Sequence, residues 1–311
     1  LTEKKPYRLS KIFSYMYVFR HGDRTPVVNF PTDLHKESEW PQGFGQLTKT
    51  GMQQLFELGQ YTRERYSNFL NSTYNRQEFY IQSTDYDRTI MSAQSYLSGL
   101  FPPTSSQIWN PELLWQPIPV HILQKTTDRV STGWTLPITP QTFPELEKLA
   151  ELSLLSLFGL YKTEEKSRLQ GGVLVNVILN SIKQAANSSK QRKMEVYSAH
   201  DTTVGALQIA LNIFNGKLPP YAACQFFELY QESSGRYSIE MHYRNDSSKD
   251  PYLLTLPGCT SSCPLEKFAE LVSPVITENW SKECGKKDKM KGSVTALYFL
   301  CKTWRNNYQD I

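Results

Sequence analysis

The chain has 311 residues, which is enough for one large α/β domain with a buried core, so a disordered protein is not expected. Its 34 Lys and Arg residues are nearly balanced by 30 Asp and Glu residues, and the net charge of +4 gives no support for a nucleic-acid partner. No apolar run approaches the roughly 20 residues of a membrane span, and residues 1–8 lack the apolar stretch of a signal peptide.

The first predicted strand is the apolar and aromatic run Phe13–Phe19. It leads into a polar loop that puts two arginines around one histidine, with the sequence Arg20-His21-Gly22-Asp23-Arg24-Thr25-Pro26. We expect a helix next, from Thr48 to about Phe69.

A second strand and helix follow the same plan. Phe79–Gln82 resembles a strand, and Ser83-Thr84-Asp85 after it offers N-cap residues for a helix. The apolar residues of that helix recur at helical spacing and are Ile90, Ala93, Leu97 and Leu100. This spacing places Arg88 in the first helical turn, just past the end of a strand.

The third strand and helix lie in the second half of the chain, after another helix expected from Gly171 to about Ala186. Met194–Ala199 is the predicted strand, and His200 and Asp201 follow it directly. The next helix has its apolar residues at Val204, Leu207, Leu211 and Phe214. Because aspartate is favoured at helix N-caps, we expect Asp201 to be both a cap and a catalyst.

This pattern predicts an α/β fold, with a mainly parallel sheet and helices on both of its faces. In such sheets, ligands bind outside the carboxyl ends of the strands, where helix N-termini direct free N–H groups at anions. Taken alone, Arg88 is typical of a surface cation and His200 of a capping or core histidine. Their joint position at strand ends, together with His21, favours one shared site.

The residue types at these strand ends suit phosphate chemistry. A phosphate monoester carries a charge of about −1.5 to −2, which forked guanidinium donors such as Arg20, Arg24 and Arg88 would bind. His21, neutral among these cations, is the candidate nucleophile, and His200 is a further phosphate donor.

Asp201 is the candidate general acid for the leaving alkoxide and, later, the base that activates water. Since a carboxyl group must be protonated to donate, we expect an acidic pH optimum. The mechanism calls for no cofactor and no metal, and the remaining histidines, His35, His121 and His242, are scattered along the chain.

Cysteines and glycosylation sequons point to the secretory route. Cys259 and Cys263 flank three residues and predict a small disulfide loop, whereas a zinc site would need a second close pair of ligands. The five cysteines leave at least one thiol unpaired. Each sequon is a weak signal by itself, and the four candidate glycan acceptors are Asn71, Asn187, Asn245 and Asn279.

With these motifs, the chain resembles the histidine acid phosphatases of the histidine phosphatase superfamily, most closely the prostatic type. The resemblance extends to about Cys284 and includes the segments Trp40–Thr48, Leu169–Val175, Leu218–Ala222 and Cys259–Leu265. It implies a phosphoglycerate-mutase-like fold. It also implies His21 as the phosphoryl acceptor, Asp201 as the proton donor, and a phosphate site formed by Arg20, Arg24, Arg88 and His200.

The resemblance also implies a secreted or lysosomal, glycosylated homodimer, in which Trp115 and His121 match the segment used for pairing. Members of the family carry a mostly helical cap after the residue that matches His121, and most of that cap is missing here. The partners of Cys224 and Cys284 would lie in the cap, so both thiols are expected to be unpaired.

The expected organisation has four parts. Residues 1–125 and 145–284 form the α/β core, residues 126–144 are a vestige of the cap, and residues 285–311 are a divergent tail without an assigned function. Thr142 and Glu145 would form a capping box for the helix that opens the second core segment.

Three alternatives remain open at this point: a phytase, a phosphoprotein phosphatase, and an inactive secreted variant that only binds phosphate. The substrate is a small phosphomonoester or a phosphoprotein, and loss of the cap should broaden the choice of alcohol or weaken its binding. Retention of both His21 and Asp201 argues against the inactive variant, because binding alone needs neither a nucleophile nor an acid.

Overall fold

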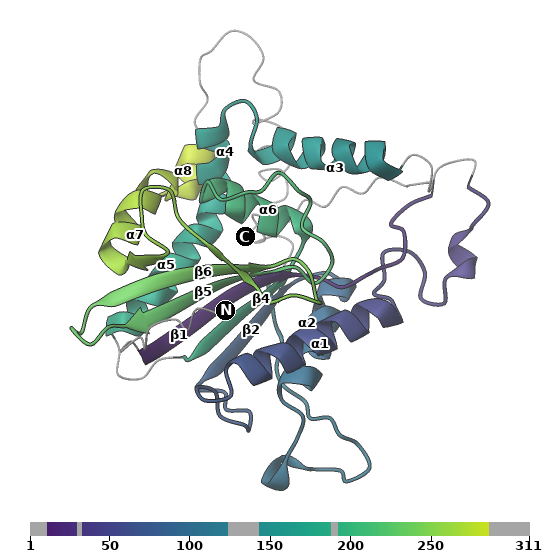
Figure 1. The fold of residues 1–311 in the computed structure, drawn as a ribbon. Coiled ribbons are helices and arrows are strands. Elements are labelled where there is room, and N and C mark those ends of the chain that lie inside the picture. The colour runs from purple at the N-terminus through teal and green to yellow at the C-terminus, as the bar shows by residue number, and fades with distance from the viewer. Residues whose placement is uncertain (1–10, 30–32, 124–142, 188–191, 286–311) are drawn as a thin grey trace, which may run out of the picture.

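The structure, a computed structural model, describes residues 11–29, 33–123, 143–187 and 192–285 and contains a mixed sheet of eight strands (Figure 1). Seven strands follow the order β3-β2-β4-β1-β5-β6-β7, and the eighth, β8, pairs with β6. The core strands β1 (Lys11–Arg20), β4 (Met194–Ala199), β2 (Phe79–Thr84) and β3 (His121–Leu123) are parallel, which confirms the predicted fold class.

The other half of the sheet is antiparallel and was not predicted. It contains β5 (Cys224–Gln231), β6 (Tyr237–Arg244), β7 (Tyr252–Leu254) and β8 (Ser262–Pro264). A short turn with Gly235 at φ +81° joins β5 to β6, and a connection of this length can join only antiparallel neighbours.

Helices cover both faces of the sheet (Figure 1). One face carries α1 (Lys49–Arg65) and α2 (Asp87–Leu100), and the other carries α5 (Gly171–Asn187), α6 (Asp201–Ala210) and α7 (Leu265–Val272). Farther from the sheet, α3 (Phe143–Phe158) packs on α6, while α4 (Thr163–Leu169) contacts α5 and α8 (Trp280–Gly285). Three 3-10 turns complete the described elements: Glu37–Glu39, Ser105–Gln107 and Ser273–Val275.

The alternation of side chains along β1 explains its position between two helical layers. Met16 and Val18 lie in the core beneath α5 and α6, while Tyr15, Tyr17 and Phe19 lie in the core beneath α1 and α2. All five side chains are at most 1% exposed, as expected of a central strand that is buried on both faces.

The helix boundaries differ from the predictions at the caps. Thr48 caps α1 by accepting a hydrogen bond from the Gly51 N–H at 3.1 Å, as the expected helix start requires. The N-cap of α2 is Tyr86, because β2 continues through Thr84, so the expected caps at residues 83–85 were wrong.

Asp201 is also not an N-cap: the cap of α6 is His200, and Asp201 is the first helical residue. Thr142 of the predicted capping box and residues 126–142 of the predicted cap vestige (126–144) lie outside the described residues, while residues 143 and 144 begin α3. The division into core segments, vestige and tail therefore stays a prediction.

The described cysteines agree with the sequence analysis. Cys259 and Cys263 form a disulfide, and Cys224 is a buried free thiol, whereas the side chain of Cys284 and all of Cys301 lie outside the described structure. The four sequon asparagines, Asn71, Asn187, Asn245 and Asn279, are all exposed. No helix within the described ranges is both long and apolar enough to cross a membrane.

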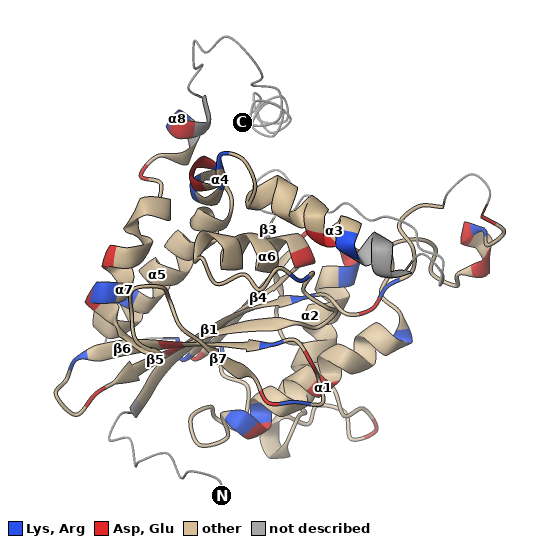
Figure 2. Ribbon diagram, turned by 45° about the horizontal axis from the view of Figure 1, so that its top comes forward, with Lys and Arg blue, Asp and Glu red and all other residues tan. Residues whose placement is uncertain are grey.

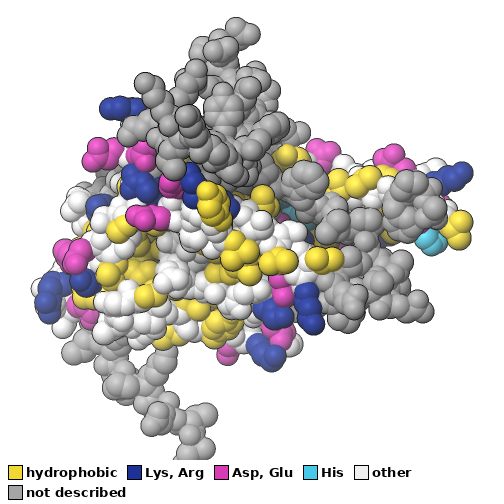
Figure 3. Space-filling model, turned by 90° about the horizontal axis from the view of Figure 1, so that it is seen from above, with side chains coloured by type: hydrophobic (Ala, Val, Ile, Leu, Met, Phe, Trp, Pro, Cys, Tyr) yellow, Lys and Arg dark blue, Asp and Glu magenta, His cyan; other side chains and the backbone are white. Residues whose placement is uncertain are grey.

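Charged residues of both signs are interspersed over the ribbon rather than gathered in one stripe (Figure 2). From the end at which α3 and α4 lie, hydrophobic side chains are exposed in several groups between charged ones (Figure 3). Among the hydrophobic residues of α3, Leu149 and Leu152 are 49% and 52% exposed. Neither view shows, among the residues that the structure describes, the basic stripe typical of a nucleic-acid-binding face.

Candidate active site

The candidate site forms where β1, β2 and β4 end side by side. In the parallel register Arg20 pairs with Ala199, and Ser83 pairs with Ser198, so the loops after all three strands begin at the same edge. The His21 N–H donates to the Ala199 carbonyl at 2.9 Å and fixes the first loop against the end of β4. The structure therefore brings together strand ends that lie far apart along the chain.

His21 is held in one orientation by its own backbone. Its side chain is buried, with 2% of the residue exposed, and Nδ1 lies 2.8 Å from the Gly22 carbonyl oxygen. Because a carbonyl can only accept, Nδ1 carries the hydrogen when the ring is neutral, and the lone pair is on Nε2.

The loop that carries His21 packs tightly on the start of α1. A Cβ atom on Gly22 would lie 2.3 Å from the Gly51 carbonyl oxygen, so only glycine fits at this close approach. The Gly22 N–H donates to Ser92 Oγ at 3.1 Å, and the Asp23 N–H donates to Gln54 Oε1 at 2.8 Å. The position of the histidine is therefore fixed by α1 and α2 as well as by β1.

Arg20 and Asp201 form a buried ion pair, with 2.8 Å between Nη2 and Oδ2 and side-chain exposures of 7% and 13%. Nη1 of Arg20 donates to the Pro219 carbonyl at 2.6 Å, and its guanidinium carbon lies 4.1 Å from the ring centre of Tyr221. Within the described residues, the buried Nε groups of Arg20 and Arg88 have no hydrogen-bond partner. Two buried guanidinium N–H donors without partners in one small site are typical of an anion-binding site.

Arg24 and Arg88 add two more cations. Arg24 Nη1 donates to the Thr25 carbonyl at 2.8 Å, and the guanidinium of Arg88 lies 4.8 Å from the ring centre of Tyr86. The pKa of Arg88 is lowered, first by burial and then by the charge of Arg24. The pKa of Arg24 is also lowered, mainly by burial, and the charge of Arg20 acts in the same direction. Three guanidinium groups thus lie close enough to repel one another.

His200 lies beside His21, with 5.5 Å between the ring centres. Its Nε2 is 3.1 Å from Thr84 Oγ1, and the Thr84 hydroxyl in turn lies 3.0 Å from Thr89 Oγ1. Burial and then the charge of Arg88 lower the pKa of His200 to about 3, although Asp201 opposes this shift. The ring is therefore neutral unless a bound anion supplies compensating negative charge.

The pKa of His21 is lowered well below its ordinary value. Burial is the largest cause, followed by the nearby charge of Arg20 and by His200, while the bond to the Gly22 carbonyl acts in the opposite direction. Protonation of Nε2 would place another positive charge among the arginines. The lone pair consequently stays available at acidic pH, where an ordinary histidine would be protonated.

The structure brings together all six site residues that the sequence predicted, and adds Thr84, Tyr86 and Tyr221. Thr84 was expected only as a helix cap, and the two tyrosines gave no local pattern that distinguishes them from core aromatics. The one available signal was their position: Tyr86 stands two residues before Arg88, and Tyr221 lies in a Pro-Pro-Tyr turn before β5.

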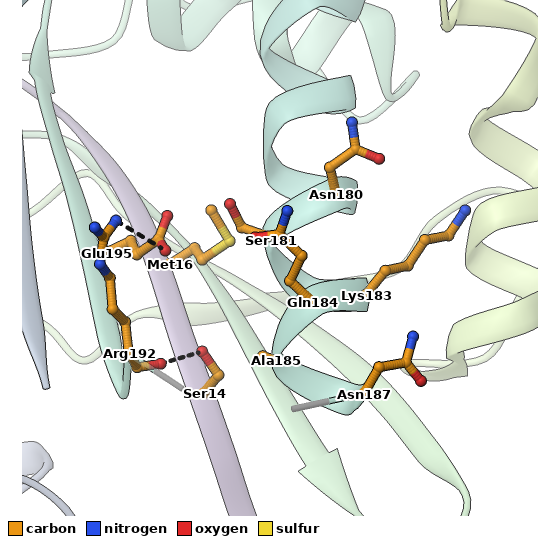
Figure 4. A pocket seen from close by; sticks show the side chains of 10 residues that line it. All are labelled: Ser14, Met16, Asn180, Ser181, Lys183, Gln184, Ala185, Asn187, Arg192 and Glu195. Atoms are coloured by element: carbon orange, nitrogen blue, oxygen red, sulfur yellow. Dashed lines mark hydrogen bonds and ion pairs between the residues drawn. The ribbon is translucent and has the colours of Figure 1, made fainter. Parts of the chain in front are cut away.

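Two other features lie away from this site. A polar cavity of about 770 Å³ opens at the other end of β1, between β4 and α5, where Ser14, Lys183, Arg192 and Glu195 are among the lining residues (Figure 4). Its lining residues include none of the six predicted site residues, which follow the other ends of the strands.

The second feature corrects the expectation that His242 lies apart from other potential metal ligands. Ligand atoms of Glu228, Glu240 and His242 lie within 4.8 Å of one another. However, the Glu228 carboxylate already pairs with Arg65 at 2.9 Å and accepts hydrogen bonds from two tyrosines, Tyr66 and Tyr230, at 2.7 Å each. This group is explained as a buried charge network beneath α1.

Comparison with known proteins agrees with this geometry. The sequence profile of the histidine phosphatase superfamily (branch 2) matches residues 12–135 and 138–244. Prostatic acid phosphatase of Rattus norvegicus is 48% identical, over 86% of this chain and 87% of its own. Lysosomal acid phosphatase of Homo sapiens is 43% identical, over 91% of this chain and 82% of its own.

The rat alignment runs over 333 positions, more than the 311 residues of this chain, so the relative contains residues that have no counterpart here. Among solved structures, the phytase of Citrobacter braakii aligns with a TM-score of 0.59 at 14% identity, covering 89% of this chain and 100% of its own. Hafnia alvei phytase in complex with tartrate aligns with a TM-score of 0.61 at 13% identity, covering 88% of this chain and 99% of its own. At such low sequence identity, these two similarities support the fold alone. The chain belongs to the histidine phosphatase superfamily, branch 2.

Proposed function

We propose that the chain is an acid phosphatase that hydrolyses phosphate monoesters through a phosphohistidine at His21. The observation that carries the proposal is a buried histidine whose Nδ1 is bound to a carbonyl and whose pKa is lowered by burial and by neighbouring cations. Such a histidine keeps a free lone pair on Nε2 in acid. Its similarity to prostatic and lysosomal acid phosphatases supports the same activity.

The cations around His21 would bind the transferring group. Arg20 and Arg88 have buried Nε donors without a partner in the described structure, and Arg24 lies near both. A phosphoryl group gains negative charge on its three outer oxygens during transfer, so preplaced guanidinium donors stabilise the transition state. His200 would become a further donor when the bound dianion favours its protonation.

Asp201 would protonate the leaving oxygen. It is the first residue of α6, directly after His200, and only Arg20 is paired with its carboxylate among the described side chains. In the first half-reaction, Nε2 of His21 forms a bond to phosphorus while the bond from phosphorus to the alkoxide oxygen breaks and that oxygen takes the proton of Asp201. In the second half-reaction, Asp201 removes a proton from water, the water oxygen bonds to phosphorus, and the bond to His21 breaks.

The proposal is tested by turnover of p-nitrophenyl phosphate at acidic pH with the parent, His21→Ala and Asp201→Ala. We expect loss of turnover with His21→Ala. With Asp201→Ala we expect a much smaller loss for this substrate than for an alkyl phosphate, because p-nitrophenolate leaves without a proton. Rapid quenching into alkali should trap a phosphorylated imidazole. Equal rates at the uncatalysed background in all three proteins would show that the site only binds phosphate.

We also propose that the protein works as a glycosylated homodimer in a secretory or lysosomal compartment. The supporting features are the Cys259–Cys263 disulfide, four exposed sequon asparagines and relatives named lysosomal acid phosphatase. The expected pairing segment is exposed: Trp115 is 40% exposed, and the ring of His121 stacks on Tyr80 with 4.5 Å between ring centres. Sedimentation of Trp115→Ala should show a monomer if this segment mediates pairing.

A further inference from the structure

Four aromatic rings form a continuous arc through the candidate site. The ring centres of Tyr221 and His21 are 5.8 Å apart, those of His21 and His200 are 5.5 Å apart, and those of His200 and Tyr86 are 5.0 Å apart. Each histidine ring therefore has one tyrosine ring and the other histidine ring as neighbours. The two tyrosines are the first and last rings of this series.

Each tyrosine also contacts one arginine of the site. The guanidinium carbon of Arg20 lies 4.1 Å from the ring centre of Tyr221, and that of Arg88 lies 4.8 Å from the ring centre of Tyr86. Both distances are within the range in which the face of an aromatic ring attracts a cation. Both tyrosines are half-buried, so this attraction is less screened by water than at an open surface.

The arginines need such support when no anion is bound. Arg20, Arg24 and Arg88 repel one another, and Asp201 is the only carboxylate paired with any of them among the described side chains. A carboxylate beside each arginine would offset the repulsion but would compete with phosphate. The ring of a tyrosine attracts the cation without occupying its hydrogen-bond donors.

Both tyrosines are held by backbone hydrogen bonds next to the site. In the turn of Tyr221, the Ala222 N–H donates to the His21 carbonyl at 3.2 Å, and the Arg20 N–H donates to the Ala223 carbonyl at 2.9 Å. Tyr86 is the N-cap of α2, where its N–H donates to the Thr84 carbonyl at 2.9 Å. The Tyr221 ring is thus placed by the backbone segment that carries His21. The Tyr86 ring is placed by the segment that carries Thr84, which contacts His200.

We propose that Tyr86 and Tyr221 are positioning residues that preorganise the phosphate site, each by holding one arginine and one histidine in place before the anion binds. The proposal rests on the proposed function of Arg20 and Arg88 as phosphate ligands. Neither tyrosine is assigned a step in the transfer, and the rings act through their faces rather than through their hydroxyl groups.

The test compares Tyr→Phe and Tyr→Leu at each position. Phenylalanine keeps the ring and removes only the hydroxyl, while leucine removes the ring and keeps an apolar side chain. Affinity for inorganic phosphate is measured by calorimetry, and kcat and KM for p-nitrophenyl phosphate are measured in parallel. From the strength of cation–π contacts, we expect each Leu variant to bind phosphate about 3-fold to 30-fold more weakly, with each Phe variant within about twofold of the parent.

If the tyrosines had only a structural role, the Leu variants would lose thermal stability, but the folded variants would bind phosphate as tightly as the parent. That result, or equal losses in the Phe and Leu variants, would overturn the proposal. This test can fail independently of the proposed function. Phosphate binding without turnover would refute the proposed phosphatase activity, yet the phosphate affinities of the Phe and Leu variants would still decide the role of the rings.

Discussion

The substitution Gly22→Ala tests how strictly the packing of one loop positions the nucleophile. The added Cβ would lie 2.3 Å from the Gly51 carbonyl oxygen and 2.6 Å from its Cα, whereas ordinary contacts begin at 3.4 Å. All the nearest atoms belong to the backbone, so no side-chain rotation can relieve the clash. The loop and α1 must separate by roughly 1 Å, and His21 moves with the loop.

A displacement of this size has two consequences. Overpacking of this kind costs about 1 to 3 kcal/mol of stability, and a 1 Å misplacement of a reacting group costs roughly 100-fold in rate. We therefore expect kcat for p-nitrophenyl phosphate to fall roughly 100-fold, while urea denaturation shows a moderate loss of stability. The enzyme is assayed well below its unfolding midpoint so that the two effects remain separate.

Gly99→Ala is the matched control. Its Cβ would lie 2.1 Å from the Phe56 carbonyl oxygen, an equally severe clash with backbone, but at the far end of α2 from Arg88, roughly 16 Å along the helix. We expect a similar loss of stability and little change in kcat for the folded protein. Equal kcat values for the two variants, or a Gly22→Ala enzyme within about threefold of the parent, would refute the reasoning.

Three further predictions follow from buried ionisable groups. After burial, Arg20 and His200, the charge of Arg88 also lowers the pKa of His21. In Arg88→Gln that pKa should rise, so the acid-side loss of activity should begin at a higher pH in a pH–rate profile. Burial raises the pKa of Glu228, but Arg65 and other partners outweigh it and lower the pKa overall. Its ionised form therefore stabilises the fold above the ordinary glutamate pKa of 4.5, and this contribution is lost as the pH falls through the lowered pKa. Glu228→Gln should consequently cost about 1 to 3 kcal/mol of unfolding free energy, measured in urea at pH 7, and less in acid. Burial raises the pKa of the Cys224 thiol, so iodoacetamide should label it only after unfolding, as mass spectrometry would show.

Each of these predictions has a result that would contradict it. An unchanged acid limb in Arg88→Gln would mean that Arg88 does not contribute to the low pKa of His21, which burial, Arg20 and His200 would then set. A stability loss in Glu228→Gln that does not depend on pH would point to lost packing rather than lost charge. Alkylation of Cys224 in the native protein would show that the start of β5 opens to solvent.

The site could be predicted from the sequence because each of its parts depends on local pattern. An apolar run such as residues 15–19 is buried on both faces, and the polar residues after it must lie at the edge of the sheet. Parallel strands share that edge, so His21, Arg88 and His200 converge whatever the intervening segments do.

Other parts depend on contacts across the fold, which a single sequence does not reveal. The ion pair of Arg20 with Asp201 joins residues 181 positions apart, and nothing near either residue marks it. The helix caps were missed because strand pairing extends β2 to Thr84, which overrides the local preference of serine, threonine and aspartate for N-caps. Tyr86 takes the cap position although its side chain makes no capping bond.

The proposed acid chemistry depends on residues that affect one another electrostatically. Burial is the largest cause of the low pKa of His21, and Arg20 and Arg88 lower that pKa further. The cations that would hold the substrate therefore also help to keep the proposed nucleophile unprotonated. Asp201 is adjacent in sequence to His200, and among the described side chains its carboxylate pairs with Arg20. A bound phosphate would therefore compete with this carboxylate for the guanidinium of Arg20, so the proposed acid and the substrate share one cationic partner.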